Sequence, residues 1–170
     1  QITKPTSDGD QKYDSATFYS ISNCQEGLSR VTLGNFLIKR VVFEIQEELP
    51  NIKHFGTLSP IPGFRDWFSY QEDGKIKNIL GDVPIENISF LKSPDLKVGD
   101  PRIVSNKVAI TKLVAHYLMN EKNNKQLPIN DVCRFHLGNG AIIDDIIINA
   151  NVSEVGLNRS FGVMVNYLYE

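Results

Sequence analysis

The sequence has 170 residues, of which 41% are hydrophobic, and this is enough apolar material for the core of one globular domain. Its 18 basic and 20 acidic residues give a formal charge of −2 without a long run of like charge, so neither nucleic acid nor an anionic membrane is an expected partner. Because no apolar run approaches the length of a membrane span, the composition predicts a soluble, intracellular protein.

The first elements follow one another as strand, helix and strand. Residues 1–15 are polar and unpatterned, as in a flexible linker or the cut edge of a longer chain. Residues 16–22 are rich in β-branched and aromatic residues and predict a strand. Apolar residues recur at helical spacing over 36–49, and Asn35 can cap this helix. Residues 52–59 then return as a second strand.

This order predicts two neighbouring, roughly parallel strands, with the loop before the helix opening above the helix N-terminus. The free amides and the dipole of such a terminus favour a phosphate. Many α/β proteins leave this helix end empty, so the pattern alone leaves both interpretations open.

A stiff turn follows the second strand, in the stretch FGTLSPIPGFRDW. Ser59 precedes Pro60, and a residue before proline is driven out of the helical region, so its hydroxyl is held on extended backbone at the mouth of a rigid loop. This placement fits a functional hydroxyl, but taken alone it favours a polar turn that merely ends a strand.

The second half begins with an irregular excursion over residues 69–104, with short helices around 75–80 and 84–92. Residues 106–122 predict a second long helix, in which His116 is a surface residue rather than a ligand. The remainder is expected to be rich in strands, with a break at Asn139–Ala141 and one shared face. The side chains expected on that face are Val163, Val165, Tyr167 and Tyr169.

Five motifs then stand in register: FYSISNCQEGL, LGNFLIKRVV, TLSPIPGF, FHLGNGA and GLNRSFGVMVNYLY. In order and spacing they resemble malonyl-CoA decarboxylases, over nearly everything from Ala16 to Tyr169 and least over the excursion. The resemblance implies an α/β domain with an α+β mixed sheet over residues 16–170, in the fold of the GCN5-related N-acetyltransferases. It also implies decarboxylation of malonyl-CoA to acetyl-CoA and carbon dioxide.

The resemblance places the family's catalytic serine and histidine at Ser59 and His136, and a supporting tyrosine at Tyr169. It implies that the CoA thioester is the substrate and that no metal or other cofactor is needed. The two cysteines, Cys24 and Cys133, also lack the spacing of a zinc site and are expected to be buried thiols. The loop implied to grip the CoA comprises Ser29, Arg30, Val31, Thr32, Leu33, Gly34 and Asn35.

Decarboxylation of a malonyl thioester leaves an enolate, which must be stabilised and protonated on carbon. A neutral Ser59 hydroxyl can orient the carboxylate, and His136 can donate the proton if its pKa lies near the working pH. A hydrolase nucleophile at Ser59 is disfavoured, because the next residue, Pro60, has no N–H for an oxyanion hole. A purely structural His136 beside a strand, or Tyr169 as an edge aromatic, remains the alternative.

The sequence departs from the family at two points of the CoA loop. Arg30 stands where many relatives have glycine, and Thr32 stands where animal relatives have an acidic residue. Family members also carry an upstream helical domain and earlier strands, so the fold is expected to be incomplete at its N-terminal side, with homo-oligomer contacts in the parent protein. An inactive CoA-binding or structural fragment, and an acetyltransferase, are the alternative functions. Mitochondrial, peroxisomal and cytoplasmic locations stay open.

Overall fold

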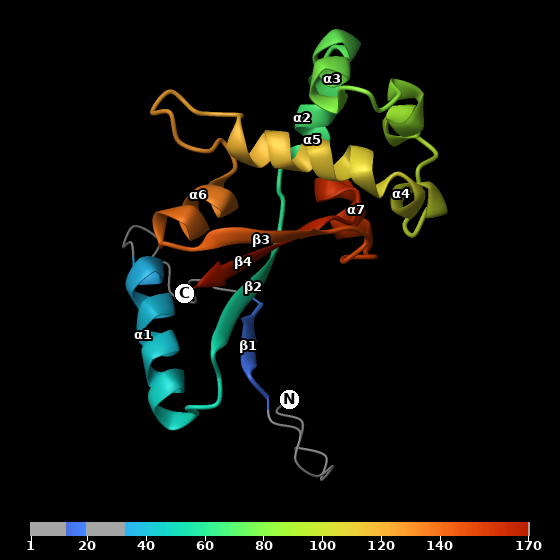
Figure 1. Cartoon of the computed structure of the whole chain (residues 1–170). Helices are drawn as coiled ribbons and strands as arrows, with labels where there is room; N and C mark the ends of the chain where they lie inside the picture. Colours follow the sequence, from blue (N-terminus) through green and yellow to red (C-terminus); the bar gives the residue numbers. More distant parts are fainter. Residues whose placement is uncertain (1–12, 20–32, 170) are drawn as a thin grey trace.

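The computed structural model describes residues 13–19 and 33–169. Within these ranges the strands form one mixed sheet in the order β1-β2-β4-β3 (Figure 1). β1 and β2 are parallel, as predicted from the helical crossover between them, and the other two pairs are antiparallel. The strands are β1 (Ser15–Phe18), β2 (His54–Pro60), β3 (Ile142–Ile147) and β4 (Met164–Tyr169).

Helix α1 (Leu33–Glu48) connects β1 to β2. Ile38 is buried and Ile45 packs against the core, which agrees with the predicted helical periodicity. The predicted start is wrong, because the backbone is already helical at Leu33. Asn35 therefore lies in the first turn and cannot take the non-helical backbone of a capping residue.

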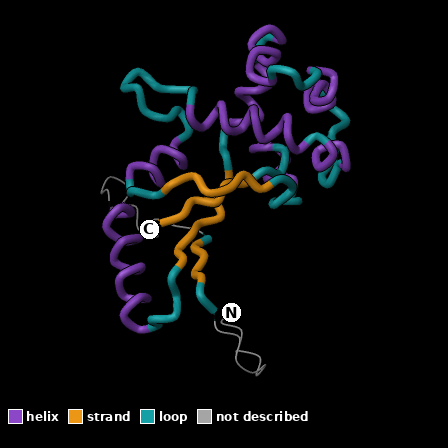
Figure 2. The backbone as a smooth tube through the Cα atoms, in the orientation of Figure 1, coloured by secondary structure: helices purple, strands orange, loops and turns teal. Residues whose placement is uncertain are grey.

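Most of the remaining helices lie between β2 and β3 and form a lobe beyond one end of β2 (Figure 2). The predicted apolar stripe of the second long helix, α5, is confirmed, since its five residues are buried. α3 and η2 agree with the two short helices predicted in the excursion, whereas α2 was not predicted. The helices of this segment are α2 (Phe64–Tyr70), α3 (Asp73–Leu80), the 3-10 helix η2 (Ile85–Lys92), α4 (Pro101–Ser105), α5 (Lys107–Met119) and α6 (Asp131–Gly138).

The expectation of a strand-rich ending is wrong, because two short helices lie there: α6, and α7 (Glu154–Ser160) between β3 and β4. Their lengths are eight and seven residues, and apolar runs this short do not distinguish a helix from a strand by periodicity. His136 therefore lies on a helix. The predicted break at Asn139–Ala141 is confirmed as the turn between α6 and β3.

One face of the sheet is covered by helices and carries polar as well as apolar groups. The predicted shared face of the last strand is confirmed, and Val165, Tyr167 and Tyr169 are buried. In the register of β2 and β4 they lie opposite Ser59, Thr57 and Phe55, which are buried too. This face collects two hydroxyls and two phenols in a mostly apolar layer.

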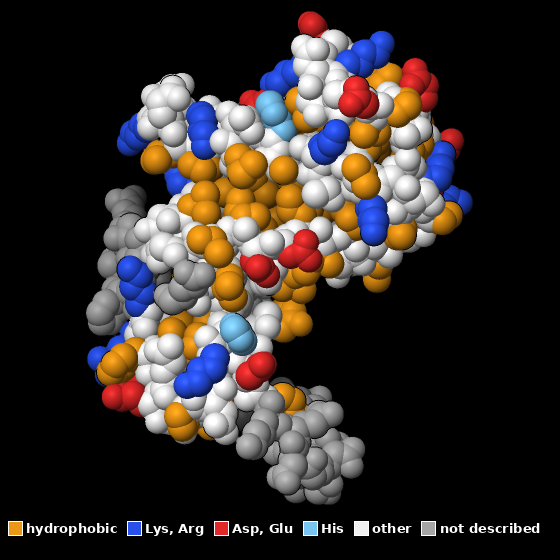
Figure 3. Space-filling model, in the orientation of Figure 1, with side chains coloured by type: hydrophobic (Ala, Val, Ile, Leu, Met, Phe, Trp, Pro, Cys, Tyr) orange, Lys and Arg blue, Asp and Glu red, His pale blue; other side chains and the backbone are white. Residues whose placement is uncertain are grey.

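The visible surface shows no single dominant charge. Lysine, arginine, aspartate and glutamate side chains are interspersed in Figure 3, and apolar side chains gather in the region of α5 and β3. Val108 and Ile142 are among the exposed apolar residues of these two elements. Among the helices of the described ranges, none combines the length and the apolar character needed to cross a membrane.

Candidate active site

The structure brings Ser59, His136 and Tyr169 together in one buried chain of hydrogen bonds. Ser59 Oγ lies 3.0 Å from His136 Nε2, and His136 Nδ1 lies 2.7 Å from Tyr169 Oη. All three side chains are at least nine-tenths buried. Ser59 lies 77 residues before His136 and Tyr169 lies 33 residues after it. Each contacts one of the two ring nitrogens of the His136 imidazole.

Ser59 is placed by the end of β2. Its backbone is extended, as predicted, but it lies within the ladder opposite Val165 rather than in the loop itself. The loop turns sharply at Gly63, where φ is 79°, and a Cβ there would lie 3.0 Å from Tyr117 Oη. Glycine tolerates both the positive φ and the close approach, so this turn can stay tight behind the serine.

His136 is placed by α6, whose first turn is tied to the same loop. The Asn130 side chain accepts a hydrogen bond from the backbone N–H of Cys133 at 2.8 Å, and so caps the helix. The same side chain donates from Nδ2 to the carbonyl of Pro62, also at 2.8 Å. One amide therefore joins the helix that carries His136 to the turn that follows Ser59.

The ring of His136 is also held by stacking. It lies 4.3 Å from the Tyr167 ring, centroid to centroid, with an interplanar angle of 18°. A stacked ring cannot rotate freely, so both imidazole nitrogens keep their directions. Strand β4 thus contributes Tyr167 to the face of the imidazole and Tyr169 to its edge.

Burial sets the protonation state of the chain. It lowers the pKa of His136 from 6.5 to about 4, because the charged imidazolium is poorly solvated there. Burial also raises the pKa of Tyr169 to about 12. The expectation from the sequence that the pKa of His136 lies near the working pH therefore differs from the structure, in which burial favours the neutral form of both groups at pH 7.

Thr57 extends the chain by one hydroxyl. Ser59 Oγ donates to Thr57 Oγ1 at 3.1 Å, and Thr57 is itself buried. Sequence reasoning missed Thr57, Asn130 and Tyr167. The signal for Thr57 was available, because residues two apart on a strand point to the same face.

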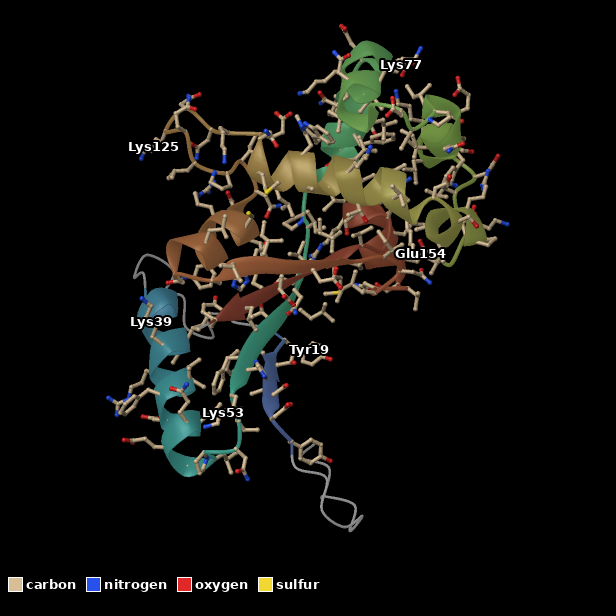
Figure 4. The ribbon with its side chains drawn as sticks, in the orientation of Figure 1. Tyr19, Lys39, Lys53, Lys77, Lys125 and Glu154 are labelled. Atoms are coloured by element: carbon tan, nitrogen blue, oxygen red, sulfur yellow. The ribbon has the colours of Figure 1, made fainter. Side chains whose placement is uncertain are left out.

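A pocket of about 250 Å³ lies between α1 and the turn after α6, beside Tyr169. Asn139 borders it, and its Oδ1 is buried without a hydrogen-bond partner among the described residues, while its Nδ2 donates to the Phe135 carbonyl. Lys39 comes from the first half of α1, as Figure 4 shows. The pocket is lined by Ile38, Lys39, Val42, Phe43, Gln46, Asn139, Gly140 and Tyr169.

The loop expected to grip the CoA is described only in part. Ser29, Arg30, Val31 and Thr32 lie outside the described residues, whereas Leu33, Gly34 and Asn35 form the first turn of α1. Figure 1 shows the start of α1 close to α6 and to the end of β4. Ile38 of α1 and Asn139 of the turn after α6 line the same pocket, so the helix that begins with the last three residues of the predicted loop lies close to the turn that follows His136.

Comparison with known sequences gives the family. The family described as "Malonyl-CoA decarboxylase C-terminal domain" matches residues 3–170. Mitochondrial malonyl-CoA decarboxylase of Rattus norvegicus is 38% identical over 91% of this chain, and that of Anser anser anser is 38% identical over 94%. The chain spans 35% of the length of each of these relatives.

Solved structures agree with this match. Malonyl-CoA decarboxylase from Rhodopseudomonas palustris aligns with a TM-score of 0.79 and 41% identity, over 91% of this chain and 36% of that one. The enzyme from Cupriavidus metallidurans gives 0.70 and 40%, over 90% and 41%. The loading GNATL domain of CurA from Lyngbya majuscula is only 11% identical but aligns at 0.54 over 95% of this chain and 57% of that domain, and confirms the acetyltransferase-like fold. The chain belongs to the malonyl-CoA decarboxylase family, in the part that the family's C-terminal domain covers.

Proposed function

We propose that this chain carries the decarboxylation site of a malonyl-CoA decarboxylase, which converts malonyl-CoA and a proton to acetyl-CoA and carbon dioxide. The observation that supports it most is the buried chain from Tyr169 through His136 to Ser59. It places a hydroxyl and a proton-bearing imidazole next to each other in an apolar layer. Family membership and the names of the relatives point to the same reaction.

In the first step the bond between the α-carbon and the carboxylate breaks, and its electron pair moves into the thioester as an enolate. This is easiest when the carboxylate is turned out of the thioester plane. The Ser59 hydroxyl can hold the carboxylate there by a neutral hydrogen bond. A cationic side chain would instead stabilise the charge that disappears in the reaction and would raise the barrier.

In the second step the enolate takes a proton on carbon. His136 supplies it from Nε2, on the side of Ser59, while Nδ1 receives the phenolic proton of Tyr169. In this transfer His136 loses one proton from Nε2 and gains another on Nδ1, so it never becomes the charged imidazolium that burial disfavours. After the products leave, Nε2 takes a proton from solvent while Nδ1 returns its proton to Tyr169 Oη, so the starting protonation of the chain is restored.

The test is to incubate the purified protein with malonyl-CoA and to measure carbon dioxide and acetyl-CoA. Equal amounts of the two products are expected. His136→Gln and Ser59→Ala should each lower kcat/KM by about 10²-fold or more, as removal of a positioned acid or an orienting group does. Ser89→Ala is the matched control, because Ser89 is exposed and, among the residues that the structure describes, its hydroxyl bonds only the carbonyl of Glu86 in its own helical segment.

Two results would count against the proposal. Carbon dioxide release at the same rate in the wild type and in both variants would remove these residues from the mechanism. A folded wild-type protein that binds malonyl-CoA without releasing carbon dioxide would instead favour the CoA-binding or structural alternative.

A further inference from the structure

The hydrogen-bond chain has a direction, and the interatomic distances indicate which. An O–H donor usually lies 2.7–2.8 Å from an oxygen acceptor, and an N–H donor usually lies 2.9–3.0 Å from an oxygen. The contact between Tyr169 Oη and His136 Nδ1 is 2.7 Å, shorter than the usual distance for an N–H that donates to oxygen, which favours the phenol as donor. The contact between His136 Nε2 and Ser59 Oγ is 3.0 Å, as expected for an N–H that donates to oxygen.

Relative donor strength gives the same direction. A phenol is a stronger hydrogen-bond donor than an aliphatic hydroxyl, because its proton is more acidic, and the unprotonated imidazole nitrogen is the strongest neutral acceptor of the chain. Pairing Tyr169 with Nδ1 therefore leaves the imidazole proton on Nε2. Ser59 must then accept from His136, and its own hydrogen needs another acceptor.

Thr57 provides that acceptor. Ser59 Oγ donates to Thr57 Oγ1 at 3.1 Å, a longer and therefore weaker contact than is usual for an O–H donor, and both side chains are buried on the same face of β2. Without this acceptor, the nearest described alternative for the serine hydrogen is His136 Nε2 itself. The imidazole would then have to carry its proton on Nδ1, and no proton would be left on the side of Ser59.

We propose that Thr57 is a positioning residue: by accepting the hydrogen of Ser59, it keeps Ser59 an acceptor and holds His136 in the tautomer that carries its proton on Nε2. The carboxylate of a bound substrate then takes over from Thr57 as acceptor for the Ser59 hydroxyl, so the direction of the chain is preserved during the reaction. His136 is thereby set as a proton donor and not as a base for Ser59.

The first experiment measures the tautomer and does not depend on activity. The protein is labelled with ¹⁵N-histidine, and the two ring nitrogens are observed by NMR at pH 7. The signals of His136 are distinguished from those of His54 and His116 by their loss in His136→Gln. We expect the proton of His136 on Nε2 in the wild type and a shift of population toward Nδ1 in Thr57→Val. In Thr57→Ser, which keeps the hydroxyl, the wild-type tautomer should return.

The second experiment measures decarboxylation of malonyl-CoA by the same three proteins, and this part rests on the proposed function. Thr57→Val should lower kcat about tenfold with KM changed less than threefold, and Thr57→Ser should recover most of the loss. Because the tautomer is read without substrate, failure of the proposed function would leave the NMR result intact.

A wild-type His136 with its proton on Nδ1 would overturn the proposal, even if Thr57→Val failed to fold. The proposal would also be wrong if a folded Thr57→Val kept both the wild-type tautomer and the wild-type kcat. Equal losses in Thr57→Val and Thr57→Ser, with the tautomer unchanged in both, would assign Thr57 a packing role instead.

Discussion

Tyr169 contributes two separable properties, a ring in the buried face of the sheet and a hydroxyl on the imidazole of His136. Its ring lies 6.1 Å from that of His136 in an edge-to-face arrangement, and its Oη contacts Nδ1 at 2.7 Å. If Tyr169 is only an aromatic residue that packs at the edge of the sheet, its ring is needed but its hydroxyl is not. Removing the hydroxyl alone therefore decides between packing and participation.

Tyr169→Phe should keep the fold and lower kcat for decarboxylation about tenfold, because Nδ1 loses its proton source while the ring remains in place. Steady-state kinetics with malonyl-CoA and the midpoint of urea unfolding are the two measurements. Tyr70→Phe is the control, since Tyr70 is 86% exposed. An unchanged kcat in Tyr169→Phe would leave Tyr169 as a packing residue.

The motifs of the sequence pointed to Ser59, His136 and Tyr169, but not to the groups that orient them. Thr57 could have been found from strand periodicity, because it stands two residues before Ser59. The lowered pKa of His136 could not have been predicted from the sequence, since it depends on burial that the packing of α6 against the sheet creates. The same is true of the stacking on Tyr167, which requires a long-range contact.

At the scale of elements, the side chain of Asn130 links α6, which carries His136, to the turn that follows Ser59. It caps α6 through the N–H of Cys133 and donates to the carbonyl of Pro62 behind Ser59. A buried polar group that loses its partner costs more than an exposed one. The geometry of His136 relative to Ser59 therefore depends in part on this amide, together with the stacking on Tyr167.

Asn130→Ala should lower the free energy of unfolding by about 1–2 kcal/mol, as expected for a lost helix cap, because the Pro62 carbonyl still accepts a hydrogen bond from Tyr117 Oη at 3.1 Å. It should also lower kcat/KM, because α6 is no longer tied to the turn after Ser59. Ser153→Ala is the matched control: Ser153 caps α7 through the N–H of Gly156 at 3.1 Å.

The control should lose about 1 kcal/mol of stability, typical of a cap, with little change in kcat/KM. Denaturant unfolding and decarboxylation kinetics on both variants separate the two effects. If Asn130→Ala loses stability but keeps the kinetic constants of the wild type, the amide stabilises the fold without positioning His136.

Helices were predictable where the apolar period was long. The sequence predicted the whole apolar stripe of α5, which has thirteen residues. For α1, which has sixteen, it predicted the helical periodicity but not the first residue of the helix. α6 and α7 were not predicted, because apolar runs this short do not distinguish a helix from a strand. The capping signals were present nevertheless, as Asn130 before Asp131 and Ser153 before Glu154, and they should outweigh a short apolar run.

At the scale of the whole molecule, the sequence predicted only the local part of the sheet topology. The crossover through α1 required β1 and β2 to be parallel neighbours. The insertion of β4 between β2 and β3 pairs segments about 100 residues apart, and no local pattern specifies such a pairing. It is this pairing that brings Tyr169 and Tyr167 to the helix that carries His136.

The neutral His136 also makes the stability of the molecule depend on pH. Its pKa falls from 6.5 to about 4 on folding, so between these values the unfolded chain binds a proton that the native state does not. This contribution is fully present above pH 6.5 and is lost as the pH falls toward 4. Between pH 7 and pH 4.5 the loss should be about 2 kcal/mol.

Urea unfolding of the wild type and of His136→Gln at pH 7 and pH 4.5 checks this expectation. Asp100, whose pKa is lowered by its hydrogen bond to Arg102, adds a pH dependence of its own, but it is present in both proteins and cancels in the comparison. The free energy of unfolding should fall by about 2 kcal/mol more in the wild type than in the variant. Equal losses in the two proteins would mean that the imidazole is solvated and chargeable in the native state. The neutral proton transfer from Tyr169 through His136 would then have no basis.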